Sequence, residues 1–219
     1  MKITKFTHAC VRLEKDGSII TVDPGGFSEI EEACQGADAI LITHEHPDHI
    51  DPDRVLEVLA AQPETVLYAP SAVVAMLGDK ASTEVGARIM ESAPDSQLEI
   101  AGFQVRTFGG QHAVIHPLVP LVANIGYLFD DAVYHPGDSL VVPYRAEPEV
   151  LLIPFHAPWS KVSEVVDFLI SVRAPLALPV HDALLNELGR GIVNRNLTGI
   201  AERYGLTYED WAPGDTREV

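Results

Sequence analysis

The chain has 219 residues, of which 47 % are hydrophobic, as expected for one folded domain (residues 1–219) with a substantial core. It carries 32 Asp and Glu against 15 Lys and Arg, which gives a formal net charge of −17. Such an acidic surface repels phosphate backbones, so a nucleic acid is a poor partner unless a local basic patch offsets the charge.

The first part of the chain is predicted to form a hairpin, followed by alternating strands and helices. Residues 2–13 alternate loosely and residues 18–22 are apolar, with the turn signal Lys15-Asp16-Gly17 between them. The apolar run 38–42 has no polar alternation, as expected of a strand buried on both faces. The other elements expected here are a sharp loop over 23–26, a short acidic helix over 28–35, a helix over 52–61 with Asp51 as N-cap, a strand over 65–68, and a helix capped by Ser71 and ended by Gly78.

The second part of the chain is predicted to contain two more hairpins and a return to strands and helices. Residues 79–95 are polar and indicate no definite element. Residues 97–108 predict a hairpin that turns at Ala101-Gly102, and residues 124–129 and 132–135 predict another that turns at Asp130-Asp131. The remaining elements expected are a strand over 150–153, an amphipathic helix beginning near Ser160, a strand over 176–180, a helix over 183–203 broken or kinked at 189–191, and a final strand over 206–211.

Four metal-competent side chains stand directly after the run 38–42: His44, His46, Asp48 and His49. Neutral imidazole and carboxylate groups suit zinc, iron or manganese, and so close together they would repel or hydrate poorly without a cation. Pro47 excludes an ordinary helix interior, because it lacks an N–H and would clash with the preceding turn. We therefore expect these ligands on a loop that leaves a buried strand.

Further candidate ligands follow other predicted strands, namely His112, Asp138 and His181. Strand ends of this kind converge on one edge of a sheet, where loops are free to carry function. The sequence therefore predicts that all seven side chains meet in one site.

In this order the seven residues resemble the metallo-β-lactamase superfamily, whose signature is His-x-His-x-Asp-His followed by a distant His, Asp and His. All seven positions match, and the resemblance spans nearly the whole chain. It implies an α/β (α+β) fold, a four-layer αβ/βα sandwich with two facing mixed β-sheets and helices outside. Asp23 matches a family position that braces the metal loop.

The resemblance also implies a binuclear, metal-dependent hydrolase. His44, His46 and His112 would hold the first metal, Asp48, His49 and His181 the second, and Asp138 would bridge them. Two divalent ions, zinc before manganese or iron, would share a hydroxide that cleaves a small ester-like bond such as a lactone, phosphodiester, thioester or amide. Asp48 would orient this hydroxide and later carry its proton.

Comparison with other branches of the superfamily narrows the set of families that the chain resembles. His46 stands where oxygen-reducing diiron relatives have Glu, which favours hydrolysis over redox chemistry. The chain shows neither the helical substrate domain of glyoxalase-II-like enzymes nor the inserted domain or basic arm of nucleic-acid-processing relatives. The motifs at 7–11, 23–26 and 179–183 are most similar to compact bacterial metal-dependent hydrolases, which include ascorbate-6-phosphate lactonase-like and N-acyl-phosphatidylethanolamine phospholipase-like groups.

Other residues are candidates for supporting the metals or contacting substrate, each with a purely structural role as the alternative. His156 could protonate the leaving group as a general acid, although packing within its loop is the simpler interpretation. The remaining candidates are His8 and His135 as supports of the ligands, His116 as a substitute ligand, Trp159 as a wall of the pocket, and Tyr144 and Arg145 as contacts for an anionic substrate.

The partner expected is a small-molecule substrate. Two alternatives are a metal-bound protein that binds or senses a metabolite without turnover and, disfavoured by the charge, a nucleic-acid-processing nuclease. No apolar run could span a bilayer and the N-terminus has no apolar signal region, which predicts a cytoplasmic protein with no membrane partner. Cys10 and Cys34 are expected to be small buried thiols rather than a disulfide, and a homo-oligomer is compatible with the sequence.

Overall fold

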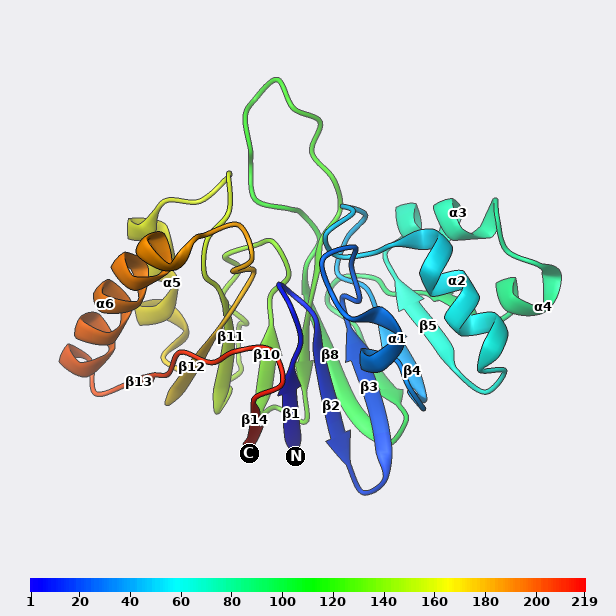
Figure 1. Cartoon of the computed structure of the whole chain (residues 1–219), viewed down its shortest axis with the longest axis horizontal. Coiled ribbons are helices and arrows are strands. Elements are labelled where there is room, and N and C mark those ends of the chain that lie inside the picture. Colours follow the sequence, from blue (N-terminus) through cyan, green and yellow to red (C-terminus); the bar gives the residue numbers. More distant parts are fainter.

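The computed structural model describes all 219 residues and contains two facing seven-stranded sheets with helices on their outer sides (Figure 1). Both sheets are mixed, because each combines antiparallel hairpins with parallel strands. The predicted four-layer α/β sandwich is thereby confirmed. The chain crosses from the first sheet to the second after residue 91 and returns to the first at its C-terminal end.

The first sheet has its strands in the order β14-β1-β2-β3-β4-β5-β6. The strands β14, β1, β2 and β3 pair antiparallel, and β3 to β6 pair parallel. Their bounds are β1 (Lys2–Lys5), β2 (Val11–Lys15), β3 (Ser18–Val22), β4 (Ala39–Leu41), β5 (Val66–Ala69), β6 (Ile89–Glu91) and β14 (Thr216–Glu218).

The second sheet repeats this arrangement in the order β13-β12-β11-β10-β9-β8-β7. The strands β7 to β10 pair antiparallel, and β10 to β13 pair parallel. Their bounds are β7 (Gln97–Ile100), β8 (Phe103–Gly109), β9 (Ile125–Phe129), β10 (Val133–His135), β11 (Val150–Pro154), β12 (Leu176–Val180) and β13 (Thr207–Tyr208).

Three apolar cores hold the layers together. A core of 19 buried residues lies between the sheets and includes Leu13, Phe103 and Tyr127. The other two cores lie beneath the helices, one on the outer face of each sheet. A fully buried Leu or Phe stabilises such a core by about 1.5–3 kcal/mol, so the strands are fixed rigidly and the loops at their ends can carry polar groups.

The helices lie outside the sheets, α1 to α4 beside the first sheet and α5 and α6 beside the second (Figure 1). Their bounds are α1 (Ile30–Ala33), α2 (Pro52–Ala61), α3 (Ser71–Gly78), α4 (Thr83–Gly86), α5 (Val162–Val172) and α6 (Glu187–Arg203). The predicted start of α2 is confirmed, because the Asp51 side chain accepts a hydrogen bond from the backbone N–H of Arg54 and Pro52 is the first helical residue.

Several expected bounds need correction at the N-terminal side. The stretch 2–13 is two antiparallel strands rather than one, because the chain reverses between Phe6 and Cys10 and His8 has a φ of 68°. The acidic helix of 28–35 is reduced to α1. Ser71 is the first residue of α3 instead of its cap, since Pro70 stands at the cap position. The segment 79–95 contains the short elements α4 and β6.

The C-terminal elements differ more from the predicted ones than the N-terminal elements do. Helix α5 begins at Val162 instead of near Ser160, and the Glu164 carboxylate accepts from the backbone N–H of Lys161. Helix α6 begins at Glu187 and runs without a break through 189–191, because the Asn186 side chain caps it by accepting from the N–H of Gly189. The final strand is only β13, and β14 was not predicted, because its partner β1 lies at the other end of the chain.

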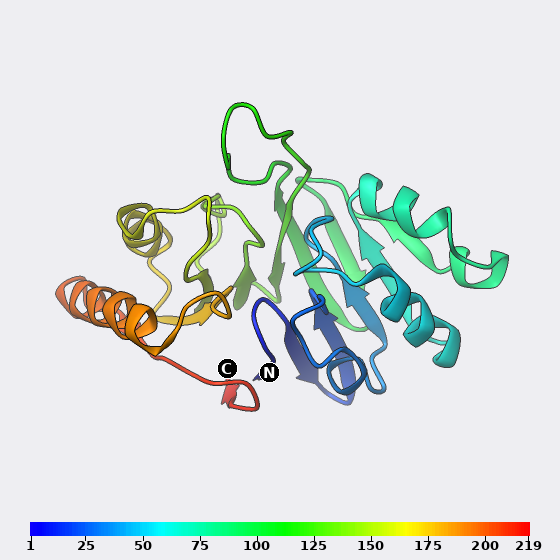
Figure 2. The same ribbon diagram turned by 45° about the horizontal axis from the view of Figure 1, so that its top comes forward.

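Two further features concern the site. The loop between β8 and β9 projects from the edge of the sandwich where the predicted ligands lie, and it stands clear of the other elements in both ribbon views (Figure 2). Cys10 and Cys34 are free and buried, as expected. None of the helices has the length and apolar character that crossing a membrane requires.

Candidate metal centre

The histidine loop begins where β4 ends, and Asp23, at the end of β3, holds it in place. One oxygen of the fully buried Asp23 carboxylate accepts from the backbone N–H of Thr43 at 2.7 Å. The other accepts from the Thr43 hydroxyl and from His49 Nδ1, each at 2.7 Å. Because β3 and β4 are parallel neighbours, Asp23 and Thr43 leave the sheet side by side. Asp23 therefore braces the loop, as its sequence position predicts.

Gly25 allows the loop after β3 to pack directly against the histidine loop. A Cβ atom at this position would lie 1.9 Å from the backbone oxygen of Asp48. The neighbouring Gly26 donates its N–H to the oxygen of Pro47 at 2.8 Å. The position of Asp48 and His49 is thus set by a contact between two backbones, which a larger residue than glycine would prevent.

Four imidazoles have their Nδ1–H groups occupied on the side away from the site. His49 donates to Asp23 at 2.7 Å, His112 to the Ala113 oxygen at 2.5 Å and His181 to the His156 oxygen at 2.7 Å. Thr43 gives its proton to Asp23, so its oxygen accepts from His44 Nδ1 at 3.0 Å. These bonds direct the Nε2 of each ring into the site, which is the arrangement usual for metal-binding histidines. The Nε2 atoms of His49, His112 and His181 make no hydrogen bond, whereas His44 Nε2 is 3.1 Å from His46 Nδ1.

The structure brings all seven predicted ligands together, in two groups. His44, His46, His112 and Asp138 place one ligand atom each within 4.8 Å of one another, and Asp48, His49 and His181 do the same with His8. Asp138 lies where the groups meet.

Its Oδ1 is 3.1 Å from His49 Nε2, and its Oδ2 is 3.1 Å from His181 Nε2 and 3.3 Å from His112 Nε2. The two groups of side chains correspond to the two ligand sets that the family resemblance implies, and Asp138 lies between them.

The site has polar atoms that the protein itself leaves without a partner. The buried atoms His49 Nε2, His112 Nε2, His181 Nε2 and Asp138 Oδ1 make no hydrogen bond. A buried polar group without a partner costs about 1–3 kcal/mol, and these four converge on the same space. A cation among them would satisfy all four, so the donor set fits one or two divalent metals. His46 and Asp48 are partly exposed, which leaves the site open to a substrate.

The electrostatics lead to the same conclusion. Burial opposes a charge on His49, but Asp138 and Asp23 outweigh burial and raise its pKa. Burial likewise opposes a charge on His181, but Asp138 and Asp48 raise its pKa to about 9. Burial and the neighbouring histidines lower the pKa of His44. The raised pKa values of His49 and His181 therefore show that the buried carboxylates favour positive charge in this space, which a cation would supply.

His8 lies beside Asp48, but its hydrogen bonds indicate a support and not a ligand. Its Nδ1 accepts the backbone N–H of Ala183 at 3.3 Å, and burial lowers its pKa, so the neutral ring carries its proton on Nε2. That atom is 3.1 Å from Asp48 Oδ2 and donates to it. His8 and His181 both have positive φ, at 68° and 59°, and the His181 N–H donates to the His8 oxygen. Backbone strain of this kind gathers at functional sites.

His135 and Trp159 contact the neighbourhood of Asp138 in different ways. His135 is fully buried, donates from Nε2 to the Ala9 oxygen at 2.9 Å and accepts the N–H of Gly137 on Nδ1 at 3.1 Å. It therefore joins the turn around His8 to the turn that presents Asp138. Trp159 donates its indole N–H to Asp138 Oδ2 at 2.8 Å.

The other predicted site residues lie further from the centre. His156 provides its backbone oxygen to His181, and its half-exposed ring has a pKa lowered by burial and by the charge of His181. His116 is exposed on the projecting loop and accepts the N–H of Leu118, so it does not join the ligands. Tyr144 and Arg145 are exposed, and their backbone oxygens accept from Arg106. The catalytic role of His156 stays a prediction.

Two supporting residues, Asn124 and Lys5, were not predicted. Asn124 is fully buried and its side chain accepts the N–H of Asp138 at 2.9 Å and donates to the Pro136 oxygen. Lys5 is fully buried and donates to the oxygens of His8 and Pro179 and to the Asp182 carboxylate. The only features of the sequence that could have indicated these supports were an Asn at the start of a strand and an Asp directly after His181.

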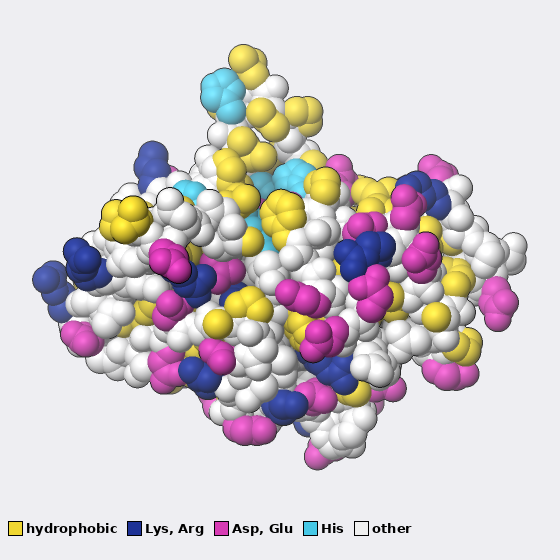
Figure 3. All heavy atoms as spheres, viewed as in Figure 1, with side chains coloured by type: hydrophobic (Ala, Val, Ile, Leu, Met, Phe, Trp, Pro, Cys, Tyr) yellow, Lys and Arg dark blue, Asp and Glu magenta, His cyan; other side chains and the backbone are white.

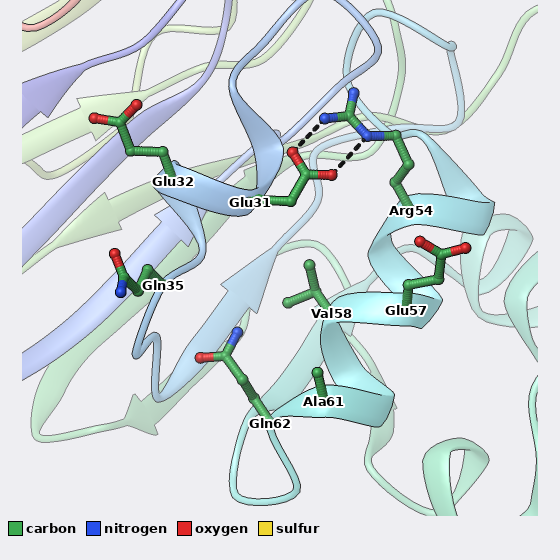
Figure 4. A pocket seen from close by; sticks show the side chains of 8 residues that line it. All are labelled: Glu31, Glu32, Gln35, Arg54, Glu57, Val58, Ala61 and Gln62. Atoms are coloured by element: carbon green, nitrogen blue, oxygen red, sulfur yellow. Dashed lines mark hydrogen bonds and ion pairs between the residues drawn. The ribbon is translucent and has the colours of Figure 1, made fainter.

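Two cavities are relevant to the site. The largest surface cavity, about 660 Å³, lies between α1 and α2, where Arg54 Nε is 3.0 Å from Glu31 (Figure 4). None of the candidate ligands lines it. A second cavity of about 430 Å³ is lined by His112 and Trp159 and therefore adjoins the metal centre.

The fold and this centre agree with what comparison shows. A family model described as a beta-lactamase superfamily domain matches residues 2–181. The chain belongs to the metallo-β-lactamase superfamily. Within the matched residues lie β3, β4, β8, β10 and β12, whose ends carry Asp23 and all seven candidate ligands.

Individual relatives in this superfamily cover most of the chain. Protein Rv0786c of Mycobacterium tuberculosis is 41 % identical over 204 residues, which are 90 % of this chain and 92 % of that protein. A UPF0173 metal-dependent hydrolase of Xanthobacter autotrophicus is 29 % identical over 175 residues, 70 % of this chain and 71 % of its own. Relatives that match most of this chain thus include proteins named as metal-dependent hydrolases.

A solved structure shows the same fold. Igni18, a metallo hydrolase of the hyperthermophilic archaeon Ignicoccus hospitalis, superposes with a TM-score of 0.75 at 17 % identity, over 100 % of this chain and 98 % of that chain. The similarity at this identity concerns the arrangement of the two sheets and their helices.

Proposed function

We propose that this metallo-β-lactamase-fold hydrolase uses two divalent cations to cleave an ester-like bond in a small molecule. The supporting observation is that three buried imidazoles are hydrogen-bonded on Nδ1 and bring an unpartnered Nε2 to within 3.3 Å of Asp138, namely those of His49, His112 and His181. His44, His46 and His112 would hold one ion, Asp48, His49 and His181 the other, and Asp138 both. Zinc suits this donor set best, with manganese and iron as alternatives.

When bound, two such ions would make a water molecule nucleophilic near neutral pH and polarise the bond under attack. The protein's own side chains would then orient the reacting groups and exchange protons with them. Asp48 is partly exposed and its Oδ2 is held by His8, so this carboxylate can receive the proton of the attacking water. The indole N–H of Trp159 holds Asp138 Oδ2 and thereby fixes the orientation of the carboxylate between the two groups.

The leaving group needs a proton when the bond breaks, and His156 is the candidate donor on the predicted site. Its ring is partly exposed, close enough to His181 for that charge to lower its pKa. A His156→Ala variant that lowers kcat most for substrates with poor leaving groups would support this role.

The partner proposed is a small-molecule substrate, and the reaction is proposed to take place in the cytoplasm. A lactone, a phosphodiester, a thioester and an amide all fit the chemistry of the centre. The net charge of −17 disfavours a nucleic-acid substrate.

The proposal is tested by loading the purified protein with Zn²⁺ or Mn²⁺ and assaying lactones, phosphodiesters, thioesters and β-lactams beside an Asp138→Ala variant. We expect hydrolysis of at least one class, reduced at least a hundredfold in the variant. Metabolite binding without turnover, or rates equal to those of the variant across the whole panel, would overturn the proposal in favour of a binding protein.

A further inference from the structure

The loop that projects beside the metal centre is apolar and exposed. Residues 113–122 contain no Lys, Arg, Asp or Glu, in a chain with 47 such residues. Its exposed side chains include Val114 at 58 %, Leu118 at 86 % and Leu121 at 45 %. Figure 3 shows hydrophobic side chains gathered on this projection, above the histidines. Apolar side chains concentrated in this way mark a surface that contacts another molecule.

The base of this loop belongs to the cavity beside His112. That cavity, about 430 Å³, is lined by Val114, Leu140, Val141, Trp159 and His112, among others. Its lining includes no Lys or Arg, and its one charged residue, Glu164, accepts the backbone N–H of Lys161 at 2.9 Å. The apolar surface of the loop is therefore continuous with a cavity that ends at a candidate metal ligand.

The loop and the metal centre are also joined by hydrogen bonds. The Ala113 N–H donates to the Asp138 oxygen at 2.8 Å, and the His112 N–H donates to the Val122 oxygen at 3.0 Å. His112 Nδ1 donates to the Ala113 oxygen. Both ends of the apolar segment are thus fixed to residues of the centre, while the residues between them make few contacts.

We propose that the substrate carries an acyl or alkyl chain, which lies in this cavity beneath residues 113–122 while the bond to be cleaved reaches the metal centre. This inference rests on the proposed hydrolytic function and names the class of its substrate. An apolar chain is stabilised by burial in the cavity without needing a cation. A phosphate or carboxylate at the same place would meet the Glu164 carboxylate, and the lining itself offers no basic group, since Lys161, whose Nζ is 3.6 Å from Glu164, is not part of it. The volume suits a chain of several carbon atoms.

Binding is measured first, with 2-butanone, 2-hexanone and 2-octanone on the metal-loaded protein. These ketones have a carbonyl and an apolar chain but no hydrolysable bond. The indole of Trp159 lies in the cavity wall, so its fluorescence reports occupancy, and a Trp159→Phe variant identifies that signal. We expect Kd to fall about twofold to fourfold for each added methylene, since burial of one methylene is worth about 0.8 kcal/mol.

Two variants test where the apolar chain of the ketone lies. Val114→Ser should raise the Kd of 2-octanone about fivefold or more, with little change for 2-butanone, because only the longer chain reaches Val114. Leu118→Ser should act in the same direction but more weakly, because Leu118 lies on the loop above the bound chain without lining the cavity. Leu188→Ser is the matched control, since Leu188 is 80 % exposed on α6 and does not line the cavity, and its Kd values should equal those of the wild type.

Kinetics of 4-nitrophenyl acetate, butanoate and octanoate complete the test. A rise of kcat/KM with chain length that Val114→Ser removes would support the proposal. Hydrolysis that depends on Asp138 but is independent of chain length, with equal Kd values for the ketones, would overturn this inference and leave the hydrolytic function intact. Ketone binding that depends on chain length without any hydrolysis would overturn the function and leave the apolar site.

Two other binding partners of the loop, a membrane surface and a second copy of the chain, would also overturn the inference. Binding to neutral phosphatidylcholine vesicles that Leu118→Ser abolishes, with no dependence of ketone Kd on chain length, would identify a membrane surface. A dimer that Leu118→Ser dissociates, again without dependence on chain length, would identify a second copy of the chain.

Discussion

His8 and Asp48 are 40 residues apart in the chain, and their contact shows how single atoms decide the chemistry of this site. The N–H of Ala183 occupies His8 Nδ1, which leaves the proton on Nε2, where it meets Asp48 Oδ2. His8 therefore acts on Asp48 as a hydrogen-bond donor. The same logic applies to His49, His112 and His181, whose outer partners on Nδ1 leave Nε2 without a hydrogen bond.

The role of His8 predicts a graded effect of substitution. His8→Ala should lower metal affinity or kcat/KM about tenfold to a hundredfold, the range usual for partners that orient metal ligands. His8→Gln should retain more metal affinity and activity than His8→Ala, because the amide N–H of the glutamine can still reach Asp48. Metal titration of both variants, with thermal unfolding to confirm that each is folded, makes the measurement. Equal losses in the two variants would contradict the proposed donor role.

Cys34 gives a prediction about pH that is independent of the metal. Burial raises the pKa of its thiol from the ordinary 9.0 to about 12. Between these values the unfolded chain loses the proton and the folded chain retains it, so stability is complete below pH 9 and is lost as pH rises toward 12. From pH 8 to pH 10 the free energy of unfolding should fall by about 1.4 kcal/mol more in the wild type than in Cys34→Ala. Urea unfolding at both pH values measures this, and parallel curves for the two proteins would contradict it.

The residues that could be predicted from the sequence are those recognisable by type and order. His44 through His181 fall in this group, because imidazoles and carboxylates after apolar runs have few other uses. Asn124 and Lys5 could not be predicted, because their partners Asp138 and Asp182 become neighbours only when distant strands pair. An Asn or Lys at a strand end has many ordinary roles.

At the scale of elements, the loops after β3 and β4 work as a pair. They leave parallel neighbouring strands and pack backbone against backbone at Gly25. The strand pattern predicted both loops, since a buried run followed by polar residues is a strong local signal, and the family resemblance predicted the brace at Asp23. The break expected in α6 was wrong for a local reason, because Gly189 and Gly191 fall within the first turns of a helix that Asn186 caps.

Gly25 provides the test at this scale. Gly25→Ala should destabilise the fold by about 2 kcal/mol or more and displace Asp48, because the new Cβ would overlap the Asp48 oxygen at 1.9 Å. Metal content and urea unfolding measure the two effects.

Gly199→Ala is the matched control for that substitution. Nothing lies within 4 Å of its Cβ position on α6, so it should stabilise the protein by about 0.5–1 kcal/mol. A Gly25→Ala variant with wild-type stability and metal content would show that the backbone contact does not hold the loop.

At the scale of the molecule, contacts between residues far apart in the sequence join the two sheets beside the site. Strand β14 pairs with β1, so the C-terminal end completes the first sheet, and Lys5 at the end of β1 reaches the end of β12 in the second. The Asp182 carboxylate lies between Lys5 and Arg190. This connection spans more than 170 residues, and no local pattern in the sequence indicates it.

Lys5 should therefore stabilise the whole molecule. Lys5→Met leaves the buried Asp182 with Arg190 as its remaining partner, and removal of one member of a buried pair costs about 3 kcal/mol. Lys2→Met is the control, since Lys2 is 42 % exposed in its pair with Glu14 and should contribute less than about 1 kcal/mol. Urea unfolding compares the two, and equal losses would show that the buried pair does not join the sheets.

Asp138 contacts both groups of ligands in the proposed two-metal centre. The direct measurement is the number of Zn²⁺ ions bound per chain when chelator-stripped protein is titrated calorimetrically and then analysed for metal. We expect two ions in the wild type, and fewer than two with at least a hundredfold loss of hydrolysis in Asp138→Ala. A single ion in the wild type, or two ions held equally well by Asp138→Ala, would contradict it.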